Sequence, residues 1–197
     1  MQVRGAILAG GHATRFAGKP KGLELVGDRR ILDLVAEALL TGLGMDPILV
    51  ANVPEAGTWR SDLRVVSDVQ PGLGALGGLY TAVVSAPAPV VCVAWDMPFV
   101  TSALVSRLAE GLEGSDVYLP ASGSRRGVEP LCAAYGPACR AAIERAIADG
   151  DSRAIGFHRR VRVGILSEAD VSTLGDARRL FFNVNTEHDL ARAQELI

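Results

Sequence analysis

The sequence predicts an α/β protein with a doubly wound, mostly parallel sheet. Short apolar runs bounded by Gly, Pro, Asp or Arg recur along the 197-residue chain, as buried parallel strands do. Segments with a helical spacing of apolar residues lie between these runs, and such alternation favours a sheet covered by helices on both faces. Hydrophobic residues make up 49% of the chain, which is enough for a substantial core.

Six apolar runs are predicted to be strands: Gly5 to Ala9, Ile48 to Ala51, Leu63 to Val66, Val90 to Trp95, Val117 to Leu119 and Val161 to Leu166. Helical stripes are formed by Ile31, Leu34, Val35, Ala38 and Leu39, and by Leu104, Val105, Leu108 and Leu112. A further helix is expected near Pro137 to Asp149. Because no repeat or long linker interrupts this order, residues 1–197 are expected to form a single domain.

Charge and composition exclude several classes of function. Lys and Arg number 20 against 22 Asp and Glu, so the chain lacks the overall basic field of most nucleic-acid-binding proteins. The longest apolar stretches, such as Pro89 to Trp95, are too short to cross a bilayer, and no signal-peptide pattern is present. We therefore expect a cytoplasmic protein that binds neither nucleic acid nor membranes. Three cysteines without metal-ligand spacing are expected to be reduced, with Cys92 in the core.

A glycine-rich, basic loop follows the first predicted strand, from Leu8 to Lys21. The pair Gly10-Gly11 lets the backbone fold tightly with its N–H groups free for phosphate oxygens, and Arg15, Lys19 and Lys21 add positive charge. The spacing fits neither a Walker A loop nor the dinucleotide fingerprint. The loop therefore indicates a different triphosphate site, although an ordinary turn with solvated cations would also explain the pattern.

Carboxylates follow the third and fourth predicted strands. Asp68 precedes a glycine-rich turn that contains Gly78, and Asp96 comes directly after a buried apolar run. A carboxylate in that position must be solvated, paired or metal-bound. Magnesium needs only one or two protein carboxylates beside water and phosphates, so Asp96 is the first candidate for a metal ligand. Alternatively, Asp96 caps the helix expected to begin near Thr101.

The last third of the chain contains two asparagines on an extended segment, Asn183 and Asn185. Alternation around Val184 directs both amides to one side, where they could contact a polar ligand. They could equally satisfy loop backbone, because Thr186-Glu-His-Asp189 has the pattern of a capping box. The two interpretations are compatible.

These motifs together resemble the sugar-nucleotide-type nucleotidyltransferases, and within them the molybdenum cofactor guanylyltransferases. The shared segments are Leu8 to Lys21, Asp68 to Gly78, Asp96-Met-Pro98 and Phe182-Asn-Val-Asn-Thr186. Many nucleotidyltransferases share the glycine-rich loop and the Asp-x-Pro motif, so only the last segment indicates which acceptor substrate is used. The chain departs from the family's pattern at Pro20, Ala75, Trp95 and Glu129, where the family commonly has Asp, Pro, Cys and Gln.

The resemblance implies a three-layer, Rossmann-like nucleotide-diphospho-sugar transferase fold. It implies transfer of GMP from GTP to molybdopterin with Mg²⁺ as cofactor and release of pyrophosphate. Catalytic residues would be Arg15, Lys21 and Asp96, with Asp96 as the metal ligand. The nucleotide would be bound by Leu8, Ala9, Gly10, Gly11, Lys21, Asn52, Asp68, Gly78 and Asp96. The acceptor would be bound by Arg153, Asn183 and Asn185.

Two other functions remain open from the sequence. A cytidylyl- or uridylyltransferase acting on molybdopterin, a sugar phosphate or an isoprenoid precursor would keep the loop and Asp96, and a nucleotide-binding protein without activity could retain the fold. We expect a monomer whose protein partners are other molybdenum cofactor biosynthesis proteins or molybdoenzymes. The partner of Glu129 and the role of the basic residues Arg159, Arg160 and Arg162 are undetermined.

Overall fold

The central element of the computed structural model is a seven-stranded sheet with the strand order β5-β4-β1-β6-β8-β7-β9. The structure describes residues 2–10, 20–86 and 88–197. The strands are β1 (Arg4–Leu8), β4 (Ile48–Val50), β5 (Val65–Val66), β6 (Val90–Ala94), β7 (Val117–Pro120), β8 (Cys132–Tyr135) and β9 (Val163–Leu166). Only β8 runs antiparallel to its neighbours β6 and β7. The predicted mostly parallel sheet is thus confirmed.

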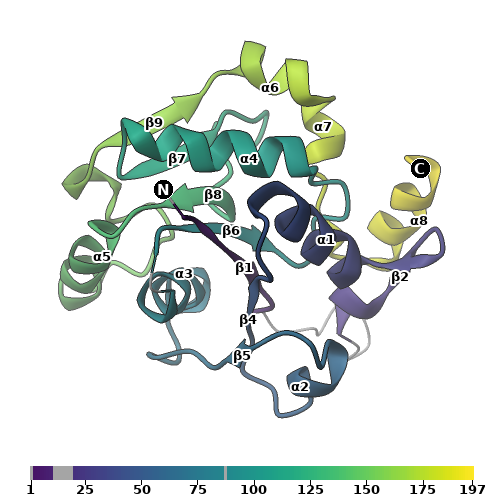
Figure 1. Ribbon diagram of the computed structural model, residues 1–197, viewed down its shortest axis with the longest axis horizontal. Coiled ribbons are helices and arrows are strands. Elements are labelled where there is room, and N and C mark those ends of the chain that lie inside the picture. The colour runs from purple at the N-terminus through teal and green to yellow at the C-terminus, as the bar shows by residue number, and fades with distance from the viewer. Residues whose placement is uncertain (1, 11–19, 87) are drawn as a thin grey trace.

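Helices cover both faces of the sheet (Figure 1). The helices α1 (Ile31–Leu43) and α4 (Ser102–Glu110) pack together on one face, and α3 (Gly74–Ser85) packs with α5 (Cys139–Ala148) on the other. Shorter helices are α2 (Ala56–Trp59), α6 (Glu168–Leu174) and α7 (Ala177–Leu180), and α8 (Glu187–Glu195) is the last element. A small hairpin of β2 (Leu25–Val26) and β3 (Arg29–Arg30) lies beside α8.

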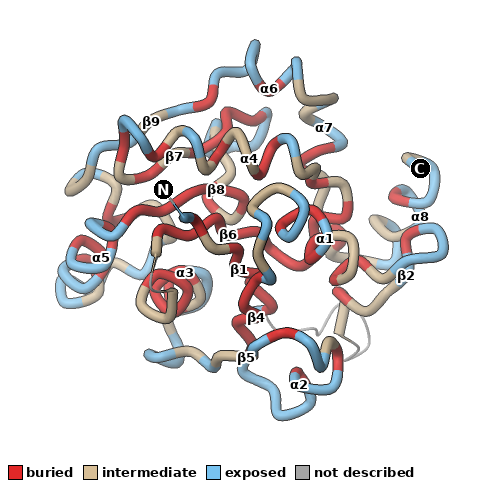
Figure 2. Tube along the Cα trace, in the orientation of Figure 1, coloured by how far each residue is buried: buried red, intermediate tan, exposed pale blue. Residues whose placement is uncertain are grey.

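Two apolar cores, one on each face, explain this layering. Successive β1 side chains alternate between them: Ile7 belongs to the core under α1 and α4, whereas Ala6 and Leu8 belong to the core under α3 and α5. Every residue of β6 is buried, because β1 and β8 flank it and helices cover both faces. Figure 2 shows the buried residues concentrated in the sheet and on the inner sides of these helices.

Sequence signals at the helix ends agree with the structure. Thr101 caps α4 by accepting a hydrogen bond from the Leu104 backbone N–H, and Thr186 and Asp189 form the expected capping box of α8. Gly44 ends α1 in the left-handed region, with φ of 70°. All three cysteines are free and buried, and Cys92 lies in the core as expected. Among the described residues, none of the helices has the length and apolar composition needed to cross a membrane.

Strand β8 is not among the six strands predicted from the sequence. Its residues, Cys-Ala-Ala-Tyr, include two alanines, which have a low strand propensity, and no alternation or long apolar run marks them as a strand. Tertiary contacts decide its conformation, since β8 is fully buried and pairs with strands on both sides. The last predicted strand, which corresponds to β9, begins at Val163 instead of Val161, because Val161 directly follows the 3₁₀ turn of residues 158–160.

Candidate active site

The carboxyl ends of four parallel strands meet at one edge of the sheet. The strands β5, β4, β1 and β6 are neighbours, and their connections bring Asp68, Asn52, Gly10 and Asp96 to that edge. Ligands of open parallel sheets bind at this edge, where the loops leave the strands. The predicted nucleotide-binding residues within the described part of the chain therefore share one end of the fold. Gly11 and Arg15 lie outside the described residues.

Lys21, Asp96 and Asn185 contact one another although they are distant in sequence. The Lys21 ammonium forms an ion pair with Asp96 Oδ2, and it donates a hydrogen bond of 2.9 Å to Asn185 Oδ1. The three residues come from the turn after the glycine-rich loop, from the end of β6 and from the segment before α8. The structure thus joins the predicted catalytic pair to one of the predicted acceptor residues.

Asp96 is buried, with only 6% of its surface exposed. Its backbone is held on both sides: the preceding Trp95 N–H donates to Leu8 O at 3.2 Å, and Val184 N–H donates to Asp96 O at 2.9 Å. The second carboxylate oxygen, Oδ1, is buried and has no hydrogen-bond partner within the described structure. Because leaving a buried charged oxygen unpaired is costly, this atom is suited to a ligand that the protein chain itself does not provide.

Two tryptophans shape the turn that carries Lys21. Trp95 stacks on Trp59 with ring centroids 5.1 Å apart, and its other surroundings include Gly22. A Cβ atom on Gly22 would lie 2.3 Å from Trp95 Cε3, so only glycine allows the turn to approach the indole this closely. Trp95, which departs from the family's pattern, therefore helps to place Lys21 next to Asp96. The sequence around Trp59, in α2, has no motif that would indicate a role in the site.

Asn52 and Asp68 form a reciprocal pair across the ends of β4 and β5. Asn52 Nδ2 donates to Asp68 Oδ2 at 2.7 Å, and the Asp68 backbone N–H donates to Asn52 Oδ1 at 2.7 Å. The buried hydroxyl of Thr81, on α3, accepts a hydrogen bond of 2.9 Å from the Val69 N–H beside this pair. Thr81 is a positioning residue that the sequence did not reveal, since one threonine in an apolar helix is not distinctive.

The glycines of this edge lie close to the same pair and to β1. A Cβ on Gly77 would be 3.2 Å from Gln70 O and 3.6 Å from Asp68 Oδ2, and one on Gly78 would touch Leu8 at 3.8 Å. Leu8 and Ala9 are buried, whereas Gly10 is exposed and a Cβ on it would have no described neighbour within 4 Å. The backbone at Gly10 is therefore accessible to a ligand.

The structure does not bring all three predicted acceptor residues together. Asn183 Nδ2 donates to Phe181 O at 2.9 Å, which is the local backbone role considered for it, whereas Asn185 contacts Lys21. Arg153 lies between α5 and β9, is mostly exposed, and forms a bidentate pair with Asp151. Figure 1 shows α5 and β9 on the opposite flank of the molecule from α8.

Glu129 and the basic residues have local partners. Ser122, a buried residue after β7, donates to Glu129 Oε1 at 2.9 Å, which supplies the partner that the sequence left undetermined. Arg160 pairs with Asp149, and Arg162 pairs with Asp116. The segment from 158 to 162 is thus largely neutralised by neighbouring carboxylates. Burial lowers the pKa of His158 within it to about 4, so His158 is neutral at pH 7.

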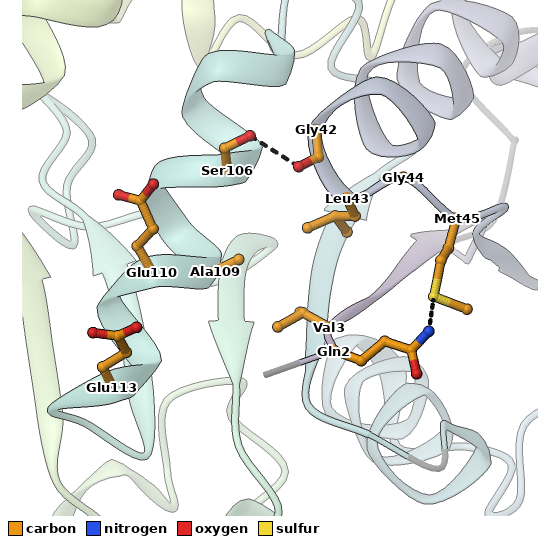
Figure 3. Close-up of a pocket in the computed structure, with 10 residues that line it drawn as sticks. All are labelled: Gln2, Val3, Gly42, Leu43, Gly44, Met45, Ser106, Ala109, Glu110 and Glu113. Atoms are coloured by element: carbon orange, nitrogen blue, oxygen red, sulfur yellow. Dashed lines mark hydrogen bonds between the residues drawn. The ribbon is translucent and has the colours of Figure 1, made fainter.

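Two surface grooves lie apart from the Lys21–Asp96 contact. The first, of about 530 Å³, is formed near the amino end of β1 by residues that include Val3, Leu43, Glu110 and Glu113 (Figure 3). Its carboxylates would repel a triphosphate, and it lies at the edge of the sheet opposite to Asp96. The second, of about 550 Å³, is lined by residues that include Pro98 and Phe99. The Arg179 guanidinium carbon lies 5.0 Å from the centroid of the Phe99 ring.

The described residues contain no cluster of three or more His, Cys, Asp or Glu side chains that could enclose a metal ion. A magnesium site does not require one, because water and substrate phosphates supply most of its ligands. A single buried carboxylate with one unpaired oxygen fits that kind of site. Asp96 at the end of β6 is such a carboxylate.

Solved structures with the same fold identify the class of protein. Molybdopterin-guanine dinucleotide biosynthesis protein A from Archaeoglobus fulgidus superposes with a TM-score of 0.82, at 26% identity, and the match covers 98% of this chain and 97% of that protein. A 4-diphosphocytidyl-2C-methyl-D-erythritol synthase from Anaerococcus prevotii superposes at 0.72 with 15% identity, covering 98% and 95%, and shows the fold alone. The predicted nucleotide-diphospho-sugar transferase fold is confirmed, and the protein is a nucleotidyltransferase.

The family follows from the sequence comparisons. Residues 5–163 match the model of the MobA-like NTP transferase domain, and the chain belongs to that family. A probable molybdenum cofactor guanylyltransferase from Pelotomaculum thermopropionicum is 37% identical over 195 residues, which cover 98% of this chain and 93% of the relative. A molybdenum cofactor guanylyltransferase from Desulfosudis oleivorans is 30% identical, covering 99% and 96%. The family predicted from the sequence motifs is confirmed.

Proposed function

We propose that the protein transfers GMP from GTP to molybdopterin, forming molybdopterin guanine dinucleotide and releasing pyrophosphate. The observation that carries this proposal is the contact between Lys21, Asp96 and Asn185 at the carboxyl edge of the sheet. It joins the glycine-rich loop to the segment that resembles the guanylyltransferases of molybdopterin. Relatives of that name match almost the full chain at 30–37% identity, which supports the choice of substrates.

In the proposed reaction, a phosphate oxygen of the acceptor attacks the α-phosphorus of GTP. The bond from that phosphorus to the oxygen bridging to the β-phosphate breaks, and pyrophosphate leaves. No protein nucleophile is needed, since the acceptor phosphate is already ionised. Positioning and charge stabilisation supply most of the rate. Backbone N–H groups around Gly10 would bind the phosphates, and Lys21, with the proposed contribution of Arg15, would stabilise the negative charge that develops on pyrophosphate.

Mg²⁺ is the proposed cofactor, and Asp96 is its proposed protein ligand. The buried Oδ1 of Asp96, for which residues 2–10, 20–86 and 88–197 provide no hydrogen-bond partner, fits this role. When bound, the ion would neutralise phosphate charge and polarise the α-phosphate for attack. Burial of Asp96 keeps its carboxylate in a fixed orientation, which is what a site with only one protein ligand requires.

Asn52 and Asp68 are the proposed contacts to the guanine nucleoside. Their reciprocal hydrogen bonds fix the Asp68 carboxylate, which still has acceptor capacity. Guanine presents N–H donors on its Watson–Crick edge, and a site that accepts from them would reject bases that leave the acceptor unpaired. Leu8, Ala9 and Gly78 would form the adjacent wall of the nucleotide site.

We further propose that the protein acts in the cytoplasm as a monomer. Its partners there would be other proteins of molybdenum cofactor biosynthesis or the molybdoenzymes that receive the product. The three buried, unpaired thiols agree with a reducing compartment.

Pyrophosphate release tests the proposed function. The enzyme is mixed with molybdopterin and MgCl₂, and GTP, CTP, ATP and UTP are compared in parallel. Release confined to GTP is expected, together with a new dinucleotide product detected by mass spectrometry. Release with CTP or UTP alone would contradict the proposal that the nucleotide is GTP. Release without molybdopterin would contradict the proposal that molybdopterin is the acceptor.

The variant Asp68→Asn tests the nucleoside contact separately. We expect a higher KM for GTP with a smaller change in the KM for molybdopterin, because Asp68 lies at the β5 end of the site. The control is Asp151→Asn, which changes a carboxylate that pairs with Arg153 in the segment between α5 and β9. If Asp68→Asn left the KM for GTP unchanged, Asp68 would not bind the nucleoside.

A further inference from the structure

Lys21 and the proposed Mg²⁺ ion would compete for the same carboxylate, that of Asp96. The ammonium of Lys21 occupies Asp96 Oδ2, and both side chains are largely shielded, with 17% and 9% of their surfaces exposed. A divalent ion bound to Asp96 would weaken this ion pair and repel the ammonium. If the ion pair were the only contact that held Lys21, the lysine would lose its position at the moment the phosphates need it.

Asn185 provides a second contact that does not depend on Asp96. Its Oδ1 accepts from the Lys21 ammonium at 2.9 Å, and an uncharged amide oxygen is not in competition for the ion in the way a carboxylate is. We propose that Asn185 is a positioning residue for Lys21, which holds the ammonium in the site while Asp96 binds the divalent ion. This inference builds on the proposed function and assigns Asn185 a role on the nucleotide side, beyond the acceptor.

The surroundings of Asn185 fix it firmly enough for that role. Its backbone N–H donates to Asp189 Oδ2 at 3.1 Å, within the capping box of α8, and the adjacent Val184 N–H is bound to Asp96 O. The segment is therefore attached both to the helix and to the end of β6. Asn183, two residues earlier, donates to Phe181 O, and within the described part of the chain it forms no hydrogen bond with Lys21.

Helix α8 also holds the backbone that follows Lys21. Gln194 Nε2 donates to Leu25 O at 2.9 Å, and Gln194 Oε1 accepts from the Gly27 N–H at 2.9 Å. The last helix of the chain thus binds the β2–β3 hairpin through Gln194, while Asn185, which lies just before the cap of this helix, binds the Lys21 side chain. Both contacts hold the end of the glycine-rich loop against the carboxyl edge of the sheet.

The composition of the chain makes this proposal testable without substrate. Lys19 and Lys21 are the only lysines in the sequence, and the remaining Lys-plus-Arg positions are all arginine. Acylation of Lys21 by an amine reagent, followed by peptide mass spectrometry, therefore reports directly on how well its ammonium is held. The α-amino group serves as the reference for reagent activity.

The first experiment measures acylation in the Asp96→Asn background, where the ion pair is gone and no metal is present. Adding Asn185→Ala is expected to raise the acylation rate of Lys21 about threefold to tenfold, as the loss of one hydrogen bond to a charged group predicts. Asn183→Ala in the same background is the control and should leave the rate unchanged. Asn185→Asp keeps the accepting oxygen and loses the amide donor, so it should restore protection.

The second experiment adds MgCl₂ to the chain with its native Asp96. Magnesium is expected to raise Lys21 acylation more in Asn185→Ala than in the unmodified protein, by a similar factor. Equal acylation with and without Asn185 in either experiment would overturn the proposal, as would an equal effect of Asn183→Ala. Circular dichroism and thermal melting identify any variant whose fold has loosened.

The result is separable from the proposed function. Acylation is measured without GTP or molybdopterin, so a protein that transferred another nucleotide would fail the pyrophosphate test and still show protection of Lys21 by Asn185. Conversely, normal guanylyl transfer with no effect of Asn185 on Lys21 acylation would leave the function intact and remove this role.

Discussion

The two edges of the sheet use charged residues in different ways. At the carboxyl edge, Lys21, Asp96 and Asn185 meet from three distant segments, and one buried oxygen of Asp96 has no hydrogen-bond partner among the residues that the structure describes. At the amino edge, where β7 and β9 begin, the exposed Arg162 pairs with the partly buried Asp116 through hydrogen bonds of 3.1 and 3.2 Å. The first arrangement is suited to a ligand, whereas the second is complete within the protein.

The two edges differ in the features that distinguish a ligand-binding site from a structural ion pair. Both edges carry oppositely charged contacts, so the presence of a pair is not informative by itself. What differs is burial together with incomplete pairing, because an unpaired charged oxygen inside a protein must be compensated by something else. The following substitutions test this difference, beginning with the largest expected effect.

Asp96→Asn should lower the turnover of pyrophosphate release by about 10²-fold to 10³-fold, because it weakens binding of the proposed Mg²⁺ ion, which would otherwise stabilise the phosphate charge. The fold should persist, since asparagine has nearly the same shape and keeps an acceptor for Lys21. Steady-state kinetics and thermal melting give the two quantities. Turnover within about twofold of the unmodified protein would show that the unpaired oxygen has no function.

Gly22→Ala should destabilise the protein by about 1–3 kcal/mol, because the added Cβ would lie 2.3 Å from Trp95 Cε3. The turn that carries Lys21 must then move, so turnover should fall as well. Gly57→Ala is the control, since a Cβ there meets nothing within 4 Å and its helix should tolerate alanine. Equal stability of both variants by chemical denaturation would contradict the close contact between the turn and the indole.

His158→Leu should reduce the loss of stability in acid. Burial lowers the folded-state pKa of His158 from 6.5 to about 4, so the unfolded chain binds this proton first. The resulting stability is complete above about pH 6.5 and is lost as the pH falls toward 4. Because His158 is partly exposed, we expect an effect of only about 1 kcal/mol, seen as a smaller drop in melting temperature between pH 7.5 and pH 5. An unchanged pH profile would show that the buried imidazole does not destabilise the fold in acid.

Arg162→Ala should have the smallest effect and marks the amino edge as structural. The Arg162 side chain is 73% exposed, so solvent screens its attraction to Asp116. Its melting temperature should change by no more than about 2 °C, with unchanged turnover. A loss of turnover comparable to that of Asp96→Asn would remove the distinction between the two edges.

Much of the candidate site was predictable because its residues lie at strand ends. The motifs around Leu8, Asp68 and Asp96 each follow an apolar run, and parallel strands bring their carboxyl ends to one edge. The pairing of Asn52 with Asp68, and the contribution of Trp59 and Thr81, could not be predicted, because contacts between distant segments leave no pattern in a single sequence. The sequence also does not distinguish Asn183 from Asn185, whereas the structure gives them different partners, Phe181 O and Lys21.

The sequence by itself determined the α/β class, most strands and helices, the family, and the identity of the residues with suitable chemistry. Periodicity, capping residues and short motifs are local properties, so they can be read directly from the chain. The tertiary structure alone decided that β8 is an antiparallel strand and that Lys21 lies between Asp96 and Asn185. Both depend on burial and on the close approach of segments separated by tens of residues, which local sequence does not encode.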